Sequence, residues 1–314
     1  MKCDISSETL HFTAMIFKGI KKKEFYIHFQ SDEDCMEYLS DLKWPDESYK
    51  CRKCEHTAYM NGKRAYSRRC KSCKYDESVT SHTLFHKLKF SLNTAFEIAF
   101  LICTQKKAVS SLALCDEMDV HYETILNFRR KLQKAMESSL DFPLEGSVEV
   151  DEFAVGGYDE GAQGRAKGDK KLVSVALEIT AKGDFGRAYA KKIEDYSSEE
   201  LKKIFEAHIS PKASVRTDKW TGYLPIKEAY PLLEQEYSDK GGNFEQLHIH
   251  IMNIKSWIRG IHHHISEKYI QRYLDEFHFR FNRRSFRESI FHKIIERFVQ
   301  SQPILHRQLN TWET

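Results

Sequence analysis

The sequence predicts a mixed α/β domain, a sheet with flanking helices, that follows a small cysteine module and a helical region. The hydrophobic pattern changes near residues 141–146, from helical spacing to the alternation that is typical of strands. Four of the eight cysteines form two close pairs well before that change. Hydrophobic residues make up 41% and charged residues 30% of the chain, which is ordinary for a globular protein.

The N-terminal part changes sharply in charge along the sequence. Residues 1–47 are interpreted as a short adaptor with a helix around 32–42. Residues 32–47 carry seven acidic side chains and one lysine, whereas residues 50–74 carry nine basic side chains and one acid. A local basic patch of this kind suits a polyanion, although a solvated charged face fits the same counts.

The cysteine module is expected at residues 48–85. Cys51 and Cys54 form one pair, fifteen residues follow, and Cys70 and Cys73 form the second pair. Two such knuckles supply the four sulfur ligands that one Zn²⁺ ion prefers, and the module is small enough that metal binding should fold it. A protein-binding ribbon is the competing use. The basic residues expected to face phosphates are Lys53, Lys63, Arg64, Arg68, Arg69, Lys71 and Lys74.

Residues 86–140 have helical periodicity. Serine or asparagine at 91–93 can cap an apolar helix, and serine at 110–111 can cap a short one. A turn at 118–120 and a basic helix from residue 121 complete a helix-turn-helix pattern. A helical hairpin that only packs is the alternative. The basic helix would offer DNA two side chains, Arg129 and Arg130.

Residues 141–300 predict the α/β domain. The expected elements are strands at 147–157, 170–180 and 186–193, a helix that begins at Ser197 or Ser198, a fourth strand at 213–218, and helices at 221–230 and within about 250–282. Residues 182–184 form the hairpin turn between the second and third strands. Three antiparallel strands, a helix, a parallel strand and further helices are the order of an RNase H-like fold.

Two acids in this domain have the positions that two-metal phosphoryl transfer requires. Val148 and Val150 share one face of the first strand, so Asp151 falls on the opposite face. Asp218 ends the fourth strand, where sites on α/β sheets lie. A lone acid at a strand end can also cap a helix. The pair predicts carboxylates that hold two Mg²⁺ ions.

A third ligand should come from the following helix. That stretch has no acid between Glu245 and Glu267, and Asn253 is the best-placed candidate. Its amide oxygen can coordinate a hard cation but brings no charge. Lys255 and Arg259 could contact the scissile strand or stabilise developing phosphate charge.

Histidines and arginines fill the rest of this segment. The histidines could form a second metal site, with His248 and His250 two residues apart and His262, His263 and His264 consecutive. Consecutive helical side chains diverge, so a shared metal ion is disfavoured, and proton transfer by His250 is an alternative role. A later basic stretch with interleaved phenylalanines predicts either a DNA-contacting edge or an apolar helix face with solvated charges. Its candidate DNA contacts are Arg280, Arg283 and Arg284.

Four stretches together resemble transposases of small bacterial insertion sequences that join an N-terminal zinc ribbon to an ISXO-like DDE domain. They are CRKC…CKSC with SVTSHTLFH, EVDEFAVGG, RTDKWTGY, and the stretch HIHIMNIKSWIRGIHHHIS with its continuation to FNRR. The resemblance spans about residues 49–295. It implies an RNase H-like fold, Mg²⁺ as the working metal, and recognition of terminal inverted repeats. The family's acids match Asp151 and Asp218, and its third position, often Asn, matches Asn253 with Lys255 close behind.

The resulting expectation is a DNA transposase with two catalytic Mg²⁺ ions and one structural Zn²⁺ ion. It would bind double-stranded DNA, both terminal repeats and target, as a homodimer or larger oligomer. No stretch approaches the roughly 20 apolar residues of a membrane span, so a bacterial cytoplasmic, nucleoid-associated protein is expected. The alternatives are a zinc-ribbon DNA-binding regulator without chemistry, an inactivated transposase copy, and a redox protein that uses its cysteine pairs.

Overall fold

The chain forms two compact units, which are described separately. Unit 1 comprises Met1–Thr104 and Glu288–Ile304, and unit 2 comprises Gln105–Arg287 and Leu305–Thr314. The predicted helical region 86–140 is therefore divided between the units, and the four-segment domain division stays a prediction. No helix among the described residues is both long and apolar enough to cross a bilayer. The computed structural model describes residues 16–156, 170–237, 239, 242–261 and 265–311.

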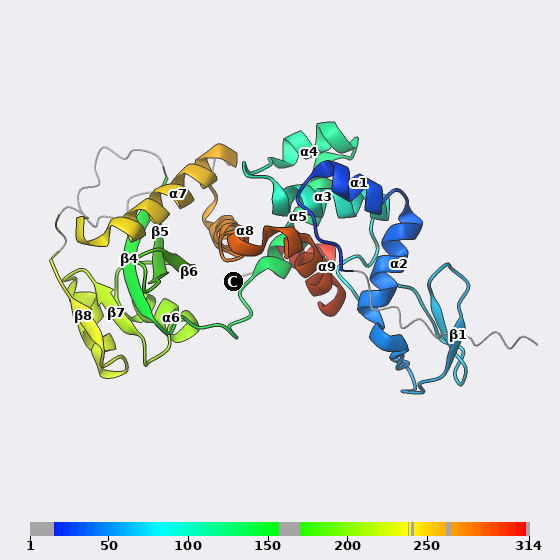
Figure 1. Ribbon diagram of the computed structural model, residues 1–314, viewed down its shortest axis with the longest axis horizontal. Helices are drawn as coiled ribbons and strands as arrows, with labels where there is room; N and C mark the ends of the chain where they lie inside the picture. Colours follow the sequence, from blue (N-terminus) through cyan, green and yellow to red (C-terminus); the bar gives the residue numbers. More distant parts are fainter. Residues whose placement is uncertain (1–15, 157–169, 238, 240–241, 262–264, 312–314) are drawn as a thin grey trace, which may run out of the picture. The chain divides into compact units, whose positions relative to one another are not determined.

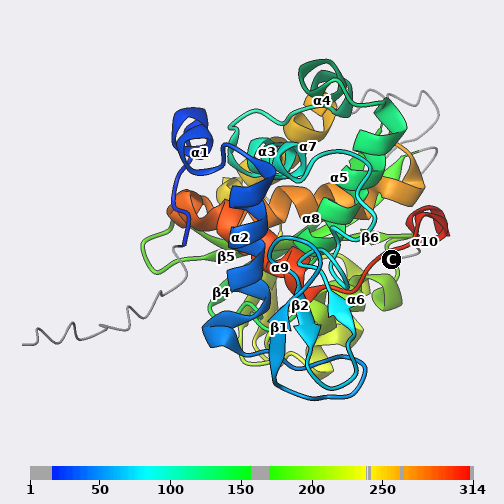
Figure 2. The ribbon, with the colours of Figure 1, turned by 90° about the vertical axis from the view of Figure 1, so that its right-hand side faces the viewer.

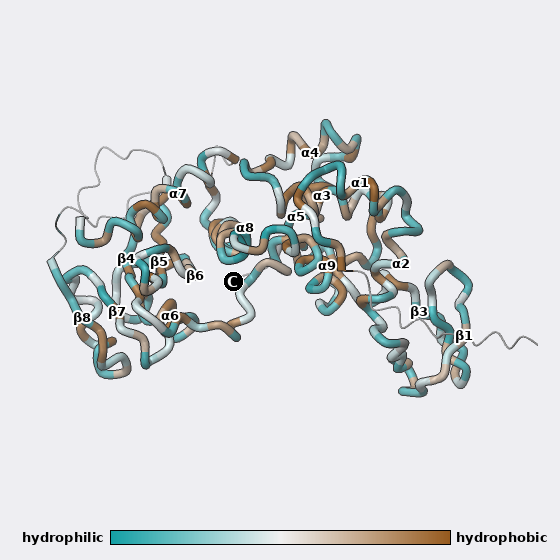
Figure 3. The backbone as a smooth tube through the Cα atoms, viewed as in Figure 1, coloured by the Kyte–Doolittle hydropathy of each residue, from teal (hydrophilic) through white to brown (hydrophobic). Residues whose placement is uncertain are grey.

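Unit 1 packs its helices around a cluster of phenylalanine rings. Phe25 stacks on Phe100 with ring centroids 4.7 Å apart, and Phe291 meets Phe25 edge-on at 5.7 Å. Figure 3 shows that the central helix of this unit, α3, is hydrophobic. The helices are α1 (Lys22–His28), α2 (Asp32–Lys43), the short 3-10 helix η1 (Pro45–Glu47), α3 (Leu92–Thr104) and α9 (Ile290–Gln300).

Serine side chains cap two helices of unit 1, and the cap expected from the sequence is the one at α3. The Ser31 hydroxyl accepts the backbone N–H of Asp34 and begins α2. Ser91 caps α3 by accepting the N–H of Thr94, whereas the Asn93 side chain donates instead to a backbone carbonyl of Phe29. Figure 2 shows α2 running toward a small sheet, β1 (Tyr59–Asn61), β2 (Arg68–Cys70) and β3 (Asp76–Glu77).

Unit 2 is built on a five-stranded mixed sheet of order β6-β5-β4-β7-β8. Strand β4 is antiparallel to β5 and parallel to β7, and β8 is parallel to β7. Gly183 has φ +80° in the β5–β6 hairpin turn, a conformation that favours glycine. The strands are β4 (Ser147–Val155), β5 (Lys171–Ile179), β6 (Phe185–Ile193), β7 (Ser214–Thr217) and β8 (Leu233–Gln235).

Helices cover both faces of this sheet (Figure 1). Val148 and Val150 point into a core with α6. Phe153 and Val155 belong to a second core with α7 and α8. The fold is thus the mixed sheet with flanking helices that the sequence predicted, and it is consistent with an RNase H-like fold. The helices of unit 2 are α4 (Ser111–Met118), α5 (Tyr122–Met136), α6 (Ser198–His208), α7 (Glu245–Ile261), α8 (Ile270–Phe281) and α10 (His306–Thr311).

The structure differs from the sequence-based expectation in three elements of unit 2. Residues 221–230 form a 3-10 helix, η2 (Thr221–Glu228), because Pro225 lacks the N–H that an α-helix interior needs. The helical segment expected from about residue 250 to 282 begins earlier, at Glu245, and consists of α7 and α8, with the short 3-10 helix η4 (Glu267–Tyr269) before α8. Strand β8 was not expected, because three residues carry too little pattern.

Candidate metal centres and nucleic-acid contacts

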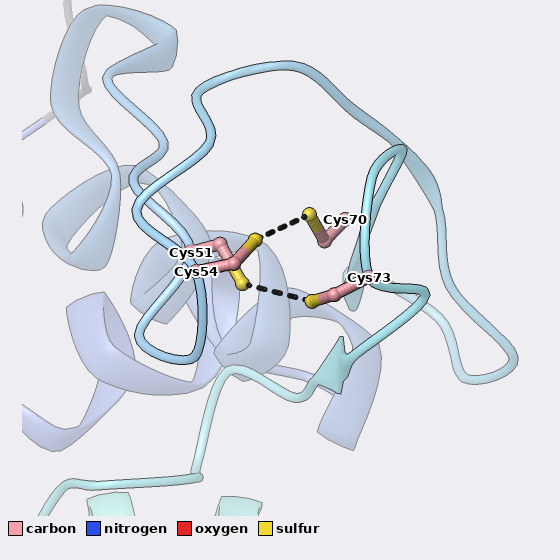
Figure 4. Close-up of side chains that lie close together, drawn as sticks. All are labelled: Cys51, Cys54, Cys70 and Cys73. Atoms are coloured by element: carbon pink, nitrogen blue, oxygen red, sulfur yellow. Dashed lines mark hydrogen bonds between the residues drawn. The ribbon is translucent and has the colours of Figure 1, made fainter.

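The four paired cysteines converge on one point (Figure 4). Their sulfur atoms all lie within 4.8 Å of one another. The Sγ atoms of Cys51 and Cys73 are 3.6 Å apart, and those of Cys54 and Cys70 are 3.5 Å apart. Four thiolates bound to one zinc ion at about 2.3 Å in a tetrahedron lie about 3.8 Å from each other. The cluster therefore fits a single structural zinc ion.

Backbone donors at the first knuckle favour the thiolate form that binds metal. Burial raises the pKa of Cys51, but the N–H groups of Lys53 and Cys54 outweigh it and lower that pKa to about 6. The backbone N–H of His56 lowers the pKa of Cys54. These bonds arise from the turn that the spacing of two residues creates, so the knuckle prepares its own sulfurs for zinc.

A buried ion pair connects the ribbon to α2. The Lys43 ammonium lies 2.8 Å from a carboxylate oxygen of Glu77, and both side chains are almost fully buried. Lys43 also donates to the backbone carbonyls of Ser78 and Ser81. Sequence reasoning missed this contact, because a lone lysine at the end of an acidic helix does not identify its partner.

Arg68 packs within unit 1 rather than projecting from it. Its guanidinium lies 4.7 Å from the ring centre of Trp44 and 4.2 Å from that of Tyr59. Stacking between two aromatic rings is a structural use of arginine. The prediction that Arg68 contacts phosphate is therefore the least supported of the phosphate contacts predicted for the ribbon.

Other basic side chains of the ribbon gather around one concavity, which we call the basic hollow. Its volume is about 420 Å³. The one acid in it, Asp76, already accepts the backbone N–H of Lys63 at 2.9 Å. Lys53 and Lys71 are exposed elsewhere on the ribbon. The residues that line the basic hollow are Lys63, Arg64, Arg69, Lys74, Asp76, Ser78 and Ser81.

The two predicted acids lie on neighbouring parallel strands of unit 2. The last residue pair in the β4–β7 ladder is Val150 with Thr217. Asp151 and Asp218 each follow this pair by one residue, at the point where the β4–β7 ladder ends. Glu149 and Arg216, two residues earlier, form an ion pair of 3.0 Å on the same side of the pleat. Alternation therefore directs Asp151 toward the α7 face, whereas Asp218 lies just past the end of β7 and its Oδ1 accepts the backbone N–H of Trp220 at 3.0 Å.

A buried tyrosine lies close to both aspartates. Tyr223 donates its hydroxyl proton to Glu152, on the α6 face of β4. Burial raises the pKa of Tyr223 well above its ordinary value, and the charges of Glu152, Asp151 and Asp218 raise it further. The charges of three carboxylates thus act on the pKa of one hydroxyl. Such a concentration of negative charge is expected at a cation site.

Helix α7 faces Asp151 with a histidine and a lysine. The Nε2 atom of His248 lies 3.5 Å from Oδ2 of Asp151. The Lys255 ammonium lies 5.3 Å from the ring centre of Phe153, the next residue on that face of β4. Burial lowers the pKa of Lys255, Arg259 lowers it further, and the Asp151 carboxylate partly offsets this. Sequence reasoning selected Lys255 but gave His248 no role at this site.

Asn253, the predicted third ligand, is exposed on α7. An α-helix turns about 100° per residue, so Asn253 is about 140° around the helix from His248. Its neighbours on that side are His250 and Trp257, whose rings pack against Phe277 of α8. The structure therefore does not bring Asn253 to the flank of α7 that meets Asp151.

His250 is a core residue. It is fully buried, and its Nε2 lies 3.2 Å from Nε2 of His278, whose Nδ1 lies 2.7 Å from the Leu274 carbonyl. His278 therefore donates through Nδ1, and His250 donates to its other nitrogen. Burial lowers the pKa of both rings, that of His278 to about 4. This corrects the expectation of proton transfer by His250. The triplet 262–264 lies outside the described residues.

Helices α4 and α5 have the predicted helix-turn-helix order, with Asp119 in the left-handed conformation at the turn. Arg129 corrects the expected DNA contact. It is 2% exposed, and its guanidinium donates to both carboxylate oxygens of buried Glu276 on α8. Half-buried Arg130 donates to Asn127 and to the Tyr269 hydroxyl. DNA contact by Arg130 therefore stays a prediction, as does the choice between a helix-turn-helix and a hairpin that only packs.

The arginines after α8 are also used internally. Arg280 donates to the Gln105 carbonyl, and Arg283 to the Phe279 carbonyl at 3.1 Å. Arg284 donates to the carbonyls of Phe281 and Gly186 at 3.0 Å each. Two of these acceptors, the carbonyls of Phe279 and Phe281, belong to the last turn of α8. All three arginines are half-buried, and DNA contact by this stretch stays a prediction. Arg259, on α7, remains exposed.

Comparison with known families gives two matches. The model of the ISXO2-like transposase domain matches residues 143–282, which include the sheet, Asp151, Asp218 and α7. The model of the transposase zinc-ribbon domain matches residues 30–76, which include α2 and all four clustered cysteines. A search of curated proteins finds no match.

Proposed function

Because the chain belongs to the insertion-sequence transposases with a transposase zinc ribbon and an ISXO2-like transposase domain, we propose that it cuts and joins DNA at the ends of its element. The observation that supports this most is the parallel register of β4 and β7. In that register Asp151, within β4, and Asp218, just past the carboxyl end of β7, follow the same residue pair, and sites on α/β sheets form beside such strand ends.

Asp151 and Asp218 supply hard oxygen donors, which suit Mg²⁺. When bound, two such ions activate the attacking oxygen and stabilise the leaving oxygen of a phosphodiester. The Tyr223–Glu152 hydrogen bond supports this part of β4 from the α6 face. Lys255 is close enough to Asp151 to interact with its charge, and its ammonium would offset charge that develops on the scissile phosphate.

The proposed reaction has two phosphoryl transfers. A water oxygen attacks phosphorus at the element end, its proton passes to solvent, and the bond to the 3′ oxygen breaks to leave a 3′-hydroxyl and a 5′-phosphate. That hydroxyl then attacks a target phosphorus, and the bond from this phosphorus to its own 3′ oxygen breaks. Because each step exchanges one P–O bond for another, no redox cofactor is required.

The zinc ribbon is the proposed holder of the terminal inverted repeat. The basic hollow and the exposed lysines Lys53 and Lys71 provide positive charge for phosphates. The buried arginine of α5 cannot contribute to this, and Arg259 of α7 would contact the strand near the reacting phosphate. Joining two element ends to one target requires at least two copies of the chain on DNA.

Nicking of a DNA fragment that carries the element end tests this function, with Mg²⁺ or Mn²⁺ and zinc-loaded full-length protein. We expect Asp151→Ala and Asp218→Ala to lower the nicking rate by about 100-fold or more, because each removes a metal ligand. Asp184→Ala, an exposed acid in the β5–β6 turn, is the matched control and should keep wild-type activity. Wild-type nicking by Asp151→Ala would refute the proposal. A wild-type protein inert on every end sequence would support an inactivated copy.

A further inference from the structure

We propose that a pocket of unit 2, which we call the arginine pocket, binds a nucleotide whose phosphate is held by Arg130 and Arg272. The pocket has a volume of about 280 Å³ and lies where the start of α4 meets α5, η4 and α8. None of the described residues that line it belongs to the basic hollow or to the pair of Asp151 and Asp218. The inference therefore goes beyond the proposed function and does not depend on it.

Positive charge dominates the arginine pocket. Among the described residues that line it there are three arginines and no acid. The charge of one of them, Arg129, is matched by Glu276, to which its guanidinium donates two hydrogen bonds. Arg130 and Arg272 therefore give the pocket an excess of positive charge, and such an excess attracts an anion.

The two guanidinium groups are held in place around one ring. Each lies 5.1 Å from the ring centre of Tyr269. Arg130 donates to Asn127 and to the Tyr269 hydroxyl, each at 3.2 Å. Arg272 donates to the backbone carbonyl of Leu309 at 3.3 Å. Because these contacts fix both side chains before a ligand arrives, binding costs little side-chain entropy, and the planar guanidinium groups suit phosphate oxygens.

Burial makes an anion more favourable here than on an open surface. Arg272 is only 1% exposed. Burial lowers the pKa of Arg272 and the charge of Arg130 lowers it further, whereas the charge of Glu137 partly offsets this. Glu137 itself forms an ion pair of 2.6 Å with Lys134. An anion bound by both arginines would offset the cost of burial and the repulsion between the two charges, in a region where water screens charge weakly.

The rest of the arginine pocket suits an aromatic base. Tyr122 is 40% exposed, and Tyr269 and Tyr273 are half-buried, so aromatic rings that a base can stack on line the pocket. Ser110 and Ser111 add hydroxyl groups that can form hydrogen bonds with the edge of a base. Sites for small ligands begin at about 300 Å³, so the volume suits a single nucleotide rather than a duplex.

A cluster of cations that only packs is the competing explanation. Tyr269 already makes cation–π contacts with both guanidinium groups, and in that view the pocket needs no ligand. The packing explanation predicts that no nucleotide binds here. The binding explanation predicts saturable binding that requires the phosphate and both arginines, so a titration distinguishes the two.

The test is isothermal titration calorimetry of dAMP into zinc-loaded full-length protein, in buffer without Mg²⁺ or Mn²⁺. We expect saturable binding, and deoxyadenosine, which lacks the phosphate, should bind at least about 10-fold more weakly. Arg130→Gln and Arg272→Met should each raise the Kd for dAMP at least about 10-fold, because each removes a charged donor. Arg64→Ala, which removes a cation from the basic hollow, is the matched control and should leave the Kd unchanged.

A second measurement needs no variant, because Arg272→Met can also disturb the packing of α8. Hydrogen exchange of the wild-type protein, read by mass spectrometry with and without dAMP, should become slower in α5 and α8. Exchange in β1–β3, which carry residues of the basic hollow, should stay unchanged. Slower exchange in β1–β3 alone would place the nucleotide in the basic hollow and overturn the inference.

A further titration distinguishes two sources of the nucleotide, with a short single-stranded oligonucleotide that carries a 5′-phosphate. Tighter binding of the oligonucleotide than of dAMP would identify a DNA strand end as the ligand, and tighter binding of dAMP would identify a free nucleotide. Either result supports the arginine pocket as a nucleotide site. If neither binds saturably at millimolar concentration, or if Arg130→Gln or Arg272→Met binds dAMP like the wild type, the inference is overturned. The proposed function would then stand, because it does not involve this pocket.

Discussion

The zinc ribbon and the pair of Asp151 and Asp218, which we call the acidic centre, are both candidate metal sites. The chain builds them in opposite ways. The ribbon takes its four sulfurs from two tight turns that are close in sequence, beside a sheet of three very short strands. The acidic centre takes its carboxylates from two strands far apart in the chain, and two apolar cores hold those strands in register. Metal should therefore determine the fold of the first site, whereas packing should determine the second without metal.

Removing zinc should produce the largest difference between the two sites. Structural zinc contributes about 10–16 kcal/mol to the folding of small zinc modules, so Cys70→Ser or a strong chelator should unfold the ribbon strands. The sheet of unit 2 should stay folded, because its core lacks any cysteine ligand. Hydrogen exchange read by mass spectrometry measures both regions in one sample. If β1–β3 stayed protected from hydrogen exchange without zinc, metal would not determine the fold of the ribbon, and the two sites would not differ in this way.

Breaking the Arg129–Glu276 pair should have the reverse effect. Arg129→Met leaves the buried carboxylate of Glu276 without its cation, a change that costs about 3–5 kcal/mol. We expect faster hydrogen exchange in α5 and α8, with zinc content unchanged. The double variant Arg129→Met with Glu276→Leu should recover most of the loss, because it leaves no buried charge unpaired. Equal exchange in wild type and single variant would mean that the pair does not support these helices.

Acid should weaken unit 2 through its buried histidines. Burial lowers the pKa of His208 from its ordinary 6.5 to about 3. The unfolded chain then binds more protons than the folded chain between these values, so the stability contribution is present above pH 6.5 and is lost as pH falls. At pH 5 the loss is about 2 kcal/mol for His208 alone.

A substitution at His208 measures that contribution. The ring stacks on Tyr189 with centroids 4.2 Å apart, so His208→Phe keeps the aromatic contact and removes the titration. We expect a smaller drop in the urea midpoint between pH 7 and pH 5 for this variant than for wild type. His306→Gln, at an exposed position, is the control and should keep the wild-type drop. If the urea midpoint of His208→Phe dropped as much as that of the wild type, groups other than His208 would cause the acid sensitivity.

The smallest expected effect concerns the basic hollow. Arg64→Ala removes one exposed cation from it, so the slope of log K against log salt for DNA binding should fall by about 0.9. The loss should be similar for every DNA sequence, because phosphates carry no base information. Lys182→Ala, in the β5–β6 turn, is the control. Fluorescence anisotropy across a salt series measures the slopes, and an unchanged slope for Arg64→Ala would remove the hollow from the DNA-binding surface.

Local patterns in the sequence predicted the parts of the molecule that local physics determines. The spacing of the cysteines predicted their convergence, and alternation in β4 predicted that Asp151 faces away from Val148 and Val150. Long-range partners could not be predicted. Arg129 looked like a surface residue of a basic helix, because nothing near it indicates that Glu276 on α8 is its partner. Strand β8 was missed because its hydrogen bonds to β7, rather than its own three residues, determine its conformation.

The orientation of α7 could not be predicted from the sequence either. The pattern around Asn253 gave the helix but not the flank that meets the sheet, since that depends on how Trp257 and His250 pack against α8. The contact of His248 with Asp151 therefore had no signal except the spacing of seven residues to Lys255, which is two helical turns.

The most direct measurement is a crystal structure of the full-length protein soaked with Mn²⁺, with anomalous scattering used to locate the ions. The account predicts an anomalous peak within about 2.0–2.6 Å of a carboxylate oxygen of Asp151 and of one from Asp218. Mn²⁺ bound elsewhere, or the two carboxylates on opposite faces of the sheet, would contradict it.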